Sequence, residues 1–84
     1  MAPKKPAHEI RMGNVRAAIW ANGKKPDEVW FNVTVTRSYK DEEGWKDTTS
    51  FRRDDLPVAA KALDMAYQWI WERQRAADPQ GEGV

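Results

Sequence analysis

The sequence interleaves cations with tryptophans along segments that have the pattern of β-strands. In residues 15–22 side chains alternate with a period of two, which puts Arg16 and Trp20 on the same side of the predicted strand. In residues 29–39 the same alternation puts Trp30 on one side together with Thr and Asn residues. Cations attract phosphate groups, and Trp rings stack on unpaired bases. This combination predicts a surface that binds single-stranded nucleic acid. The alternative is an ordinary solvated sheet face, on which Thr, Lys and Arg are also common.

Other kinds of chemistry find little support in the residue types. The chain has no Cys and a single His, which excludes cysteine-ligated metal sites and leaves little room for a His-based triad. The pair Asp54–Asp55 is typical of a helix cap rather than of a catalytic dyad. Four further carboxylates surround one turn without the spacing of a calcium loop: Asp41, Glu42, Glu43 and Asp47. We therefore expect no enzyme, no metal, no cofactor and no small-molecule substrate.

The chain length and the distribution of charge set further bounds. Eighty-four residues are enough for one domain with a thin core, because so short a chain removes only about 60% of its unfolded surface from water. The net charge is +1, but residues 1–53 carry +4 and residues 54–84 carry −3. No apolar run approaches the roughly 20 residues that cross a bilayer, and no segment resembles a secretory signal. We expect a cytoplasmic protein without membrane contact.

The hydrophobic pattern predicts strands followed by one helix. The first β segment, over 9–22, is interrupted at Gly13–Asn14 by a bulge or tight turn, so it forms either one bent strand or two strands. Further strands are predicted over 29–39 and 45–51, and a helix runs from the Asp54–Asp55 cap to about residue 75. The predicted fold is α+β, with an antiparallel meander of three to four strands followed by one long C-terminal helix packed on one sheet face. Residues 1–7 and 76–84 are expected to be flexible tails around a single domain of residues 8–75.

The predicted helix carries more apolar surface than one small sheet can cover. At 100° per residue it has two neighbouring apolar stripes that exceed half its circumference, whereas one sheet needs somewhat over 100°. The first stripe is expected to face the sheet: Leu56, Ala59, Ala60, Leu63, Ala66, Tyr67 and Ile70. The second is expected to form a homodimer interface: Val58, Ala62, Met65 and Trp69. In the alternative interpretation, N-terminal residues such as Ile10 and Met12 cover the second stripe.

The sheet face turned away from the helix is expected to be basic and aromatic. If the valine parity of residues 29–35 faces the helix, the opposite parity, from Trp30 to Lys40, faces outward. If Trp45 and Phe51 point inward, the third strand presents its cations on the same outer face, which then contains no carboxylate. The expected nucleic-acid contacts are seven residues: Arg16, Trp20, Trp30, Arg37, Lys46, Arg52 and Arg53. Of these, Arg37 shares the inward parity and would have to reach round the sheet edge.

Two resemblances accompany these patterns. A meander of strands followed by one C-terminal helix, with a basic aromatic sheet face, resembles the positive-cofactor transcriptional coactivators and their Whirly relatives over residues 8–75. That resemblance, which is one of topology, implies single-stranded DNA binding across a curved sheet and a dimer interface formed by helices. The strings IRMGNVRAAIW, RSYKDEEGWKDTTSF and DDLP are similar to a group of small uncharacterised bacterial and phage-type proteins. This second resemblance implies a compact family and no particular activity.

The sequence therefore predicts a homodimeric protein that binds single-stranded DNA or RNA on its sheet, largely independently of base sequence. The alternative is a non-enzymatic protein–protein interaction adaptor, of the kind that serves phages or mobile elements, whose exposed Trp residues anchor a protein partner. Ionic strength separates the two hypotheses. Nucleic-acid binding falls steeply with salt, whereas a protein contact anchored by Trp changes little.

Overall fold

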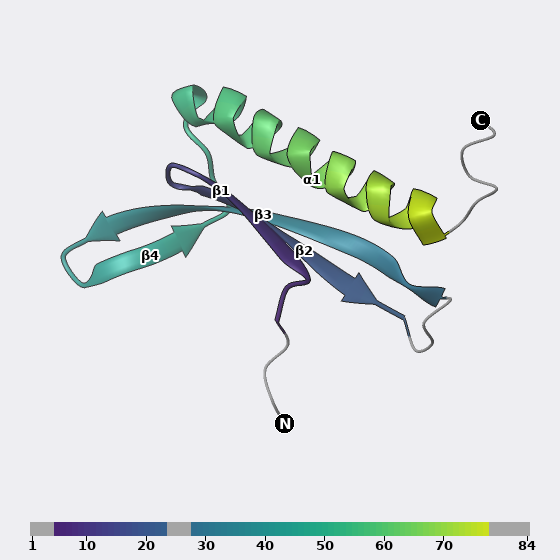
Figure 1. Cartoon of the computed structure of the whole chain (residues 1–84). Coiled ribbons are helices and arrows are strands. Elements are labelled where there is room, and N and C mark those ends of the chain that lie inside the picture. The colour runs from purple at the N-terminus through teal and green to yellow at the C-terminus, as the bar shows by residue number, and fades with distance from the viewer. Residues whose placement is uncertain (1–4, 24–27, 78–84) are drawn as a thin grey trace.

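The computed structural model describes residues 5–23 and 28–77, with side chains up to Gln74. Within these residues the chain forms β1 (His8–Met12), β2 (Val15–Asn22), β3 (Trp30–Asp41), β4 (Gly44–Thr48), the 3₁₀ turn η2 (Arg53–Asp55) and α1 (Leu56–Ala77). The described strands form one antiparallel sheet in the order β1-β2-β3-β4, and α1 lies on one face of it (Figure 1). The predicted α+β meander with a C-terminal helix is confirmed. The parts of the predicted tails at residues 1–4 and 78–84 lie outside the described residues.

A two-residue turn at Gly13–Asn14 separates β1 from β2. Met12 pairs with Val15 directly across the turn, and Gly13 has a φ of 61°, which glycine adopts without steric cost. The sequence is compatible with either one bent strand or two strands, and the structure has two. The change of parity at this point follows from the reversal, because Ile10 on β1 and Ala17 on β2 are paired and point to the same face.

The β3–β4 turn is equally short. Asp41 pairs with Gly44, and the Asp41 Oδ1 accepts a hydrogen bond from the Glu43 N–H at 2.8 Å. β4 ends at Thr48, three residues before the predicted end, where the Thr48 Oγ1 accepts a hydrogen bond from the Ser50 N–H at 3.1 Å. Such a local side-chain bond competes with the sheet ladder. The chain therefore leaves the sheet early and runs to α1.

Asp55 ties the start of α1 to the sheet. The sequence predicts that Asp54 or Asp55 accepts hydrogen bonds from the first N–H groups of the helix. The Asp55 Oδ2 accepts a hydrogen bond from the Arg52 N–H at 3.2 Å, which is a capping-box contact at the start of η2. The same oxygen lies 3.3 Å from the Arg37 Nε. Because Arg37 belongs to β3, this carboxylate links the beginning of the helix to the middle of the sheet.

Three alanines bring α1 close to the sheet. Ala59, Ala62 and Ala66 are buried. They share one core cluster with four strand residues: Ile10, Val15, Ala17 and Ile19. Small side chains on the helix allow the close approach that dense packing requires. The strand residues are therefore almost completely covered, with Ile19 at 0% exposure.

The helix is consequently rotated about its axis relative to the prediction, so a different apolar stripe faces the sheet. Ala62, which the sequence assigned to a homodimer interface, is at 0% exposure inside the chain's own core, and Val58 and Trp69 pack against that core. The cluster also contains Ile10, with Met12 packed against it, so the alternative interpretation of this stripe agrees with the structure. Three large residues of the stripe expected against the sheet are exposed instead: Leu56, Leu63 and Tyr67.

Trp69 completes the contact between helix and sheet near the end of α1. Its ring stacks on His8 of β1 at a centroid distance of 5.0 Å and meets the edge of Phe31 of β3 at 5.5 Å. The Arg73 guanidinium lies 4.7 Å from the centroid of the same ring. His8 is exposed to solvent on its other side, so the stacking contact with Trp69 covers only part of it.

Candidate nucleic-acid interface

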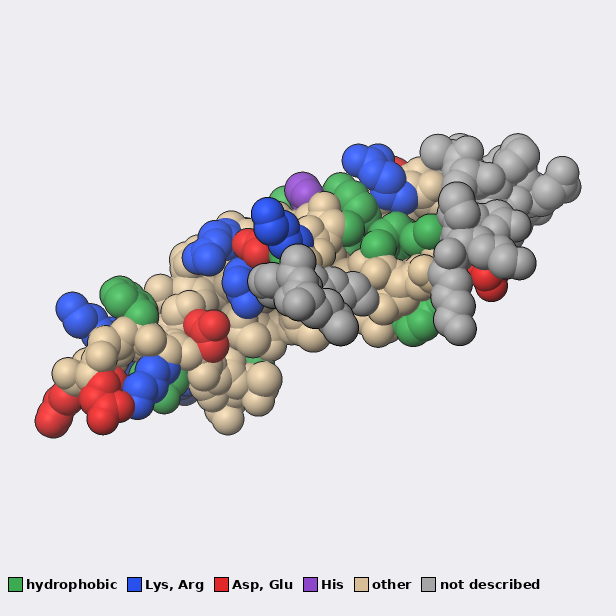
Figure 2. Space-filling model, turned by 90° about the horizontal axis from the view of Figure 1, so that it is seen from below, with side chains coloured by type: hydrophobic (Ala, Val, Ile, Leu, Met, Phe, Trp, Pro, Cys, Tyr) green, Lys and Arg blue, Asp and Glu red, His purple; other side chains and the backbone are tan. Residues whose placement is uncertain are grey.

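The sheet face opposite α1 is not covered by any element of the described chain (Figure 1), and Figure 2 shows it from below. Residues paired across antiparallel strands point to the same face, so the register assigns its side chains. We call this surface the open face and define it by the following residues: Glu9, Arg11, Arg16, Ala18, Trp20, Asn22, Trp30, Asn32, Thr34, Thr36, Ser38, Lys40, Trp45 and Asp47.

Two tryptophans lie at one end of the open face. Trp30 pairs with Asn22 and Trp20 pairs with Asn32, so the two rings are diagonal neighbours within reach of each other. Trp30 is 52% exposed. Trp20 is half-buried, and its Nε1–H donates a hydrogen bond to the Thr34 Oγ1 at 2.9 Å. This hydrogen bond restrains the orientation of the Trp20 ring on the open face.

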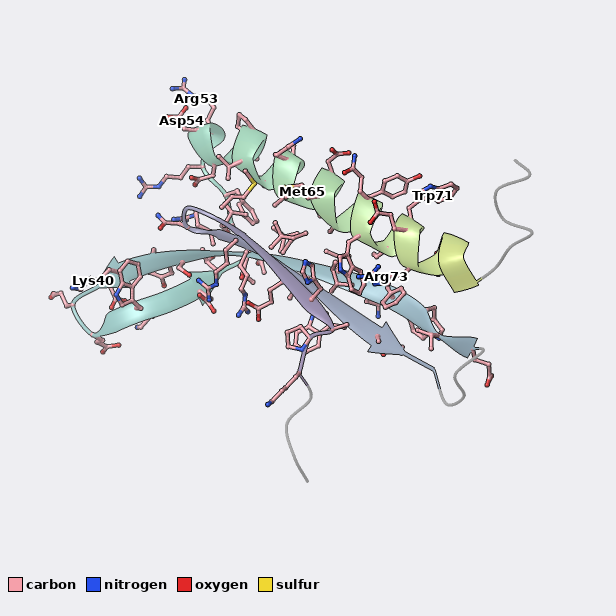
Figure 3. All side chains as sticks on the ribbon, viewed as in Figure 1. Lys40, Arg53, Asp54, Met65, Trp71 and Arg73 are labelled. Carbon is pink, nitrogen blue, oxygen red and sulfur yellow. The ribbon has the colours of Figure 1, made fainter. Side chains whose placement is uncertain are left out.

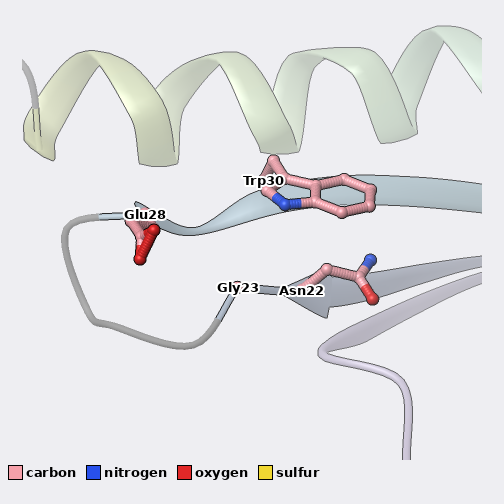
Figure 4. A pocket seen from close by; sticks show the side chains of 4 residues that line it. All are labelled: Asn22, Gly23, Glu28 and Trp30. Atoms are coloured by element: carbon pink, nitrogen blue, oxygen red, sulfur yellow. The ribbon is translucent and has the colours of Figure 1, made fainter.

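An open hollow lies beside Trp30 (Figure 4). Its lining is formed by Asn22, Gly23, Glu28 and Trp30. Gly23 has a φ of 121°, and a Cβ at this position would lie 2.6 Å from the Glu28 carbonyl oxygen. Glycine is therefore required where these two segments approach each other. The hollow is open to solvent on the side of the Trp30 ring.

The charge on the open face is lower than the sequence predicts. Glu9 and Asp47 both belong to it, which corrects the expectation of a face without carboxylates. The Glu9 carboxylate lies 3.7 Å from Arg16 and 3.8 Å from Arg11. With Lys40, the face carries three cations and two carboxylates, a net charge of +1. Glu9 is therefore placed to compete with phosphate for the arginines beside it.

The parity of β4 is the reverse of the predicted one. Trp45 pairs with Lys40, which puts it on the open face, and it is 68% exposed, whereas the sequence placed it in the core. The prediction assumed that Trp45 and Phe51 share a strand and point to the same side. Because β4 ends at Thr48, Phe51 is not part of the strand and does not determine its parity.

Lys46, one of the expected contacts, consequently lies on the other face. It pairs with Tyr39, and its Nζ lies 2.7 Å from the Glu43 Oε1 and 3.1 Å from the Asp41 Oδ2. The hydrogen bonds with Glu43 and then Asp41 raise the pKa of Lys46 above its ordinary value. This cation is engaged with the carboxylates of its own hairpin.

Arg37 is also engaged within the protein. Its side chain is 15% exposed and lies on the helix side of the sheet, where its Nε donates to the Ser50 carbonyl oxygen at 3.0 Å and pairs with Asp55. Its guanidinium lies 5.9 Å from the centroid of the Tyr39 ring. A phosphate could recruit this arginine only by breaking the contacts that connect β3 to the start of α1.

The last two expected cations lie outside the sheet. Arg52 and Arg53 belong to the connection between β4 and α1, and the Arg53 Nε lies 3.2 Å from the Asp54 Oδ1. Figure 3 shows Arg53 and Asp54 beside the start of the helix, away from the open face. The structure thus brings together three of the seven expected residues: Arg16, Trp20 and Trp30.

Sequence reasoning omitted three open-face residues from the site: Arg11, Lys40 and Trp45. The parity of Ile10 and Met12 was sufficient to find Arg11, since the residue between two inward side chains points outward. Lys40 was expected to face outward but was not included among the contacts. The sequence contains no comparable signal for Trp45, because its orientation depends on where β4 ends.

No protein-family model matches the chain, and neither does any curated protein or solved structure. The topological resemblance to the positive-cofactor and Whirly proteins therefore stays a prediction. In the part of the chain that the structure describes, no three His, Cys, Asp or Glu side chains are placed to hold a metal ion. The described helices include none long and apolar enough to cross a membrane.

Proposed function

We propose that this chain is a homodimeric protein that binds single-stranded DNA or RNA on the open face, largely independently of base sequence. One observation carries the proposal. An uncovered sheet face brings Trp20 and Trp30 together with Arg16, flanked by hydroxyl and amide groups. Stacking supplies roughly 1–3 kcal/mol per base, and the cations supply a salt-dependent attraction to phosphates.

The dimensions of the open face suit an extended polynucleotide. Trp30 and Lys40 are ten residues apart on β3, which is roughly 33 Å at about 3.3 Å per residue. Asn32, Thr34 and Thr36 lie between them on the same face, and such groups contact phosphate or base edges without demanding one sequence. A polynucleotide whose bases stack on the tryptophans at one end of the open face can therefore reach Lys40 at the other end.

The homodimer is part of the proposal because α1 leaves large apolar side chains in solvent. Leu56, Leu63, Tyr67 and Trp71 are between 43% and 65% exposed. Of the four predicted interface residues, Ala62 lies in the core and Val58 and Trp69 pack against it, whereas Met65 is 39% exposed. A contiguous apolar patch of this kind is typical of a protein–protein contact.

The proposal is tested by fluorescence anisotropy with a labelled oligonucleotide of about 12 nucleotides, within the usual range of about 4–16 for such sites. We expect binding at low salt that weakens as salt rises, and weaker binding to the same sequence as a duplex, whose bases are not free to stack. Trp30→Ala should weaken binding about 5- to 150-fold, as the loss of one stacked base requires.

A pair of arginine variants supplies the control. Arg16→Ala removes an open-face cation, whereas Arg53→Ala removes an exposed cation beside the start of α1. We expect the first to weaken binding and to reduce the salt dependence, and the second to do neither. Absence of binding at low salt would refute the proposed function. A partner that binds through Trp20 and Trp30 without salt dependence would instead support the adaptor hypothesis.

A further inference from the structure

One edge of β3 has no strand beside it over most of its length. β2 pairs with residues 30–37 of β3, whereas β4 pairs with residues 37–41. In the described chain, the other edge of residues 30–36 is therefore left without a partner strand. We call this segment the β3 edge.

The hydrogen-bond pattern shows which backbone groups point out of the β3 edge. The Ser38 N–H donates to the Asn14 carbonyl oxygen at 2.8 Å, so the backbone groups of Ser38 point toward the β2 side. Backbone groups alternate in direction along a strand, and the β2–β3 register has no interruption. The N–H and C=O groups of Phe31, Val33 and Val35 therefore point to the free side, where no described strand pairs with them.

The β3 edge lacks the features that protect the outer strands of this sheet. β1 carries Glu9 and Arg11, and β4 carries Lys46 and Asp47, so both outer strands are short and charged. The segment from Trp30 to Thr36 contains no charge, Pro or Gly. A seven-residue run of this composition on an open edge is a hazard for aggregation that folded proteins normally cover.

An apolar flank of α1 lies on the same side of the molecule. Met65 and Glu72 line a small hollow together with Ile10 of β1, so that flank of the helix lies toward β1. Helical spacing places the opposite flank toward β3, and its large side chains are exposed: Leu56, Leu63 and Tyr67. Tyr67 stacks on Trp71 at 6.4 Å, and Trp71 projects from the outer side of the helix (Figure 3).

We propose that the β3 edge pairs with the β3 edge of a second copy, antiparallel and across a two-fold axis at Val33, so that the two sheets become one continuous sheet. This inference rests on the proposed homodimer and names its interface. The register pairs Phe31 with the partner's Val35 and satisfies the outward N–H and C=O groups on both strands. It also places Asn32 opposite the partner's Thr34, so the two open faces join into one surface.

The symmetry and the composition of the β3 edge favour a second copy over other occupants. A two-fold contact is self-complementary, and an uncharged antiparallel strand is a partner that this chain itself supplies. The three exposed side chains on this flank of α1 offer roughly 300 Å² per copy, which is less than half of the about 800 Å² per partner in a stable interface. The β3 edge and the half-buried Phe31, Val33 and Val35 beside it extend this area.

Amide hydrogen exchange measured by NMR on the unmodified protein tests the inference directly. The amides of Asn32, Thr34 and Thr36 point to β2 and should be protected at every concentration. Those of Phe31, Val33 and Val35 should exchange fast in dilute solution and become protected as the protein dimerises. If the protein dimerises while these three amides still exchange fast, the β3 pairing is wrong and the homodimer stands. If sedimentation shows a monomer at high concentration, both are wrong.

Two variants at one position provide an independent test by sedimentation equilibrium. Val33→Pro removes an N–H that points out of the β3 edge and leaves the β2–β3 hydrogen bonds in place, whereas Val33→Ala keeps the N–H and shortens the same side chain. With folding checked by circular dichroism, we expect Val33→Pro to weaken dimerisation about tenfold or more, because two symmetry-related hydrogen bonds are lost. Val33→Ala should weaken it far less. Equal effects of the two variants would overturn the proposed pairing.

Discussion

Replacing Glu9 by Gln should strengthen binding to single-stranded nucleic acid. Glu9 is the carboxylate closest to the open-face arginines, at 3.7 Å from Arg16 and 3.8 Å from Arg11. A phosphate that approaches either arginine must displace it or accept its repulsion. The Gln side chain has nearly the same shape without the charge, so the substitution removes this competition and leaves the strand intact.

The size of the expected gain in affinity follows from the distances of Glu9 to Arg16 and Arg11. In a water-like dielectric each contact is worth about 1 kcal/mol by Coulomb's law. Measured surface ion pairs give about 0.2–1 kcal/mol, because salt and side-chain entropy oppose them. Since the Glu9 side chain is 34% exposed, we take roughly 0.5–1.5 kcal/mol for the two contacts together, which predicts a two- to tenfold lower Kd. Each phosphate that takes the place of Glu9 should also steepen the salt dependence by about 0.7 in log–log slope.

Anisotropy titration over a series of salt concentrations measures both quantities. The matched control is Asp64→Asn, which raises the net charge from +1 to +2 as Glu9→Gln does. Asp64 lies on α1, 3.9 Å from Lys61, and so does not belong to the open face. We expect a lower Kd and a steeper salt dependence for Glu9→Gln and little change in either for Asp64→Asn. Equal gains would show that overall charge governs binding, and weaker binding by Glu9→Gln would refute the role of Glu9 as a competitor.

Two further predictions concern the hairpin and the helix phase. The Lys46 Nζ should titrate above its ordinary pKa of 10.5, chiefly because of the hydrogen bond with Glu43, and Glu43→Gln should lower that pKa in an NMR titration. Because folding raises the pKa of Lys46, the contact stabilises the folded state at neutral pH and loses this effect as the pH rises through the folded-state pKa. An unchanged Lys46 pKa in Glu43→Gln would contradict the assignment. Ala62→Leu should lower the free energy of unfolding by about 1–3 kcal/mol, since Ala62 is fully buried, whereas Ala60→Leu on the exposed side should change it by less than about 0.5 kcal/mol. Urea unfolding compares the two, and a larger loss for Ala60→Leu would mean that the helix is rotated differently.

Local patterns were sufficient to predict the elements of the fold. Alternation identified the strands, and Gly13–Asn14 marked a break that became the β1–β2 turn. The absence of Gly and Pro after Pro57 indicated one long helix. These signals are short-range, because strand parity and turn chemistry depend on residues that are near in sequence.

The composition of the site was harder to predict than the fold. Arg16, Trp20 and Trp30 were placed correctly on the open face, because β2 and β3 are long and regular. Arg37 and Lys46 were expected at the same site, but each has carboxylate partners on the helix side of the sheet. A sequence shows which residues of a strand share a face. Which carboxylate pairs with each cation depends on how the chain folds around it.

The sequence by itself determined the order of the elements and the alternation of side chains along them. The tertiary structure decided which apolar stripe of α1 meets the sheet. Leu63 and Tyr67 have much larger apolar side-chain surfaces than Ala62 and Ala66, yet it is the alanines that are buried. The physical reason is that close packing selects side chains by the space between helix and strands as well as by hydrophobicity. That choice leaves the leucine and tyrosine flank beside the β3 edge, on the surface that we propose joins two copies.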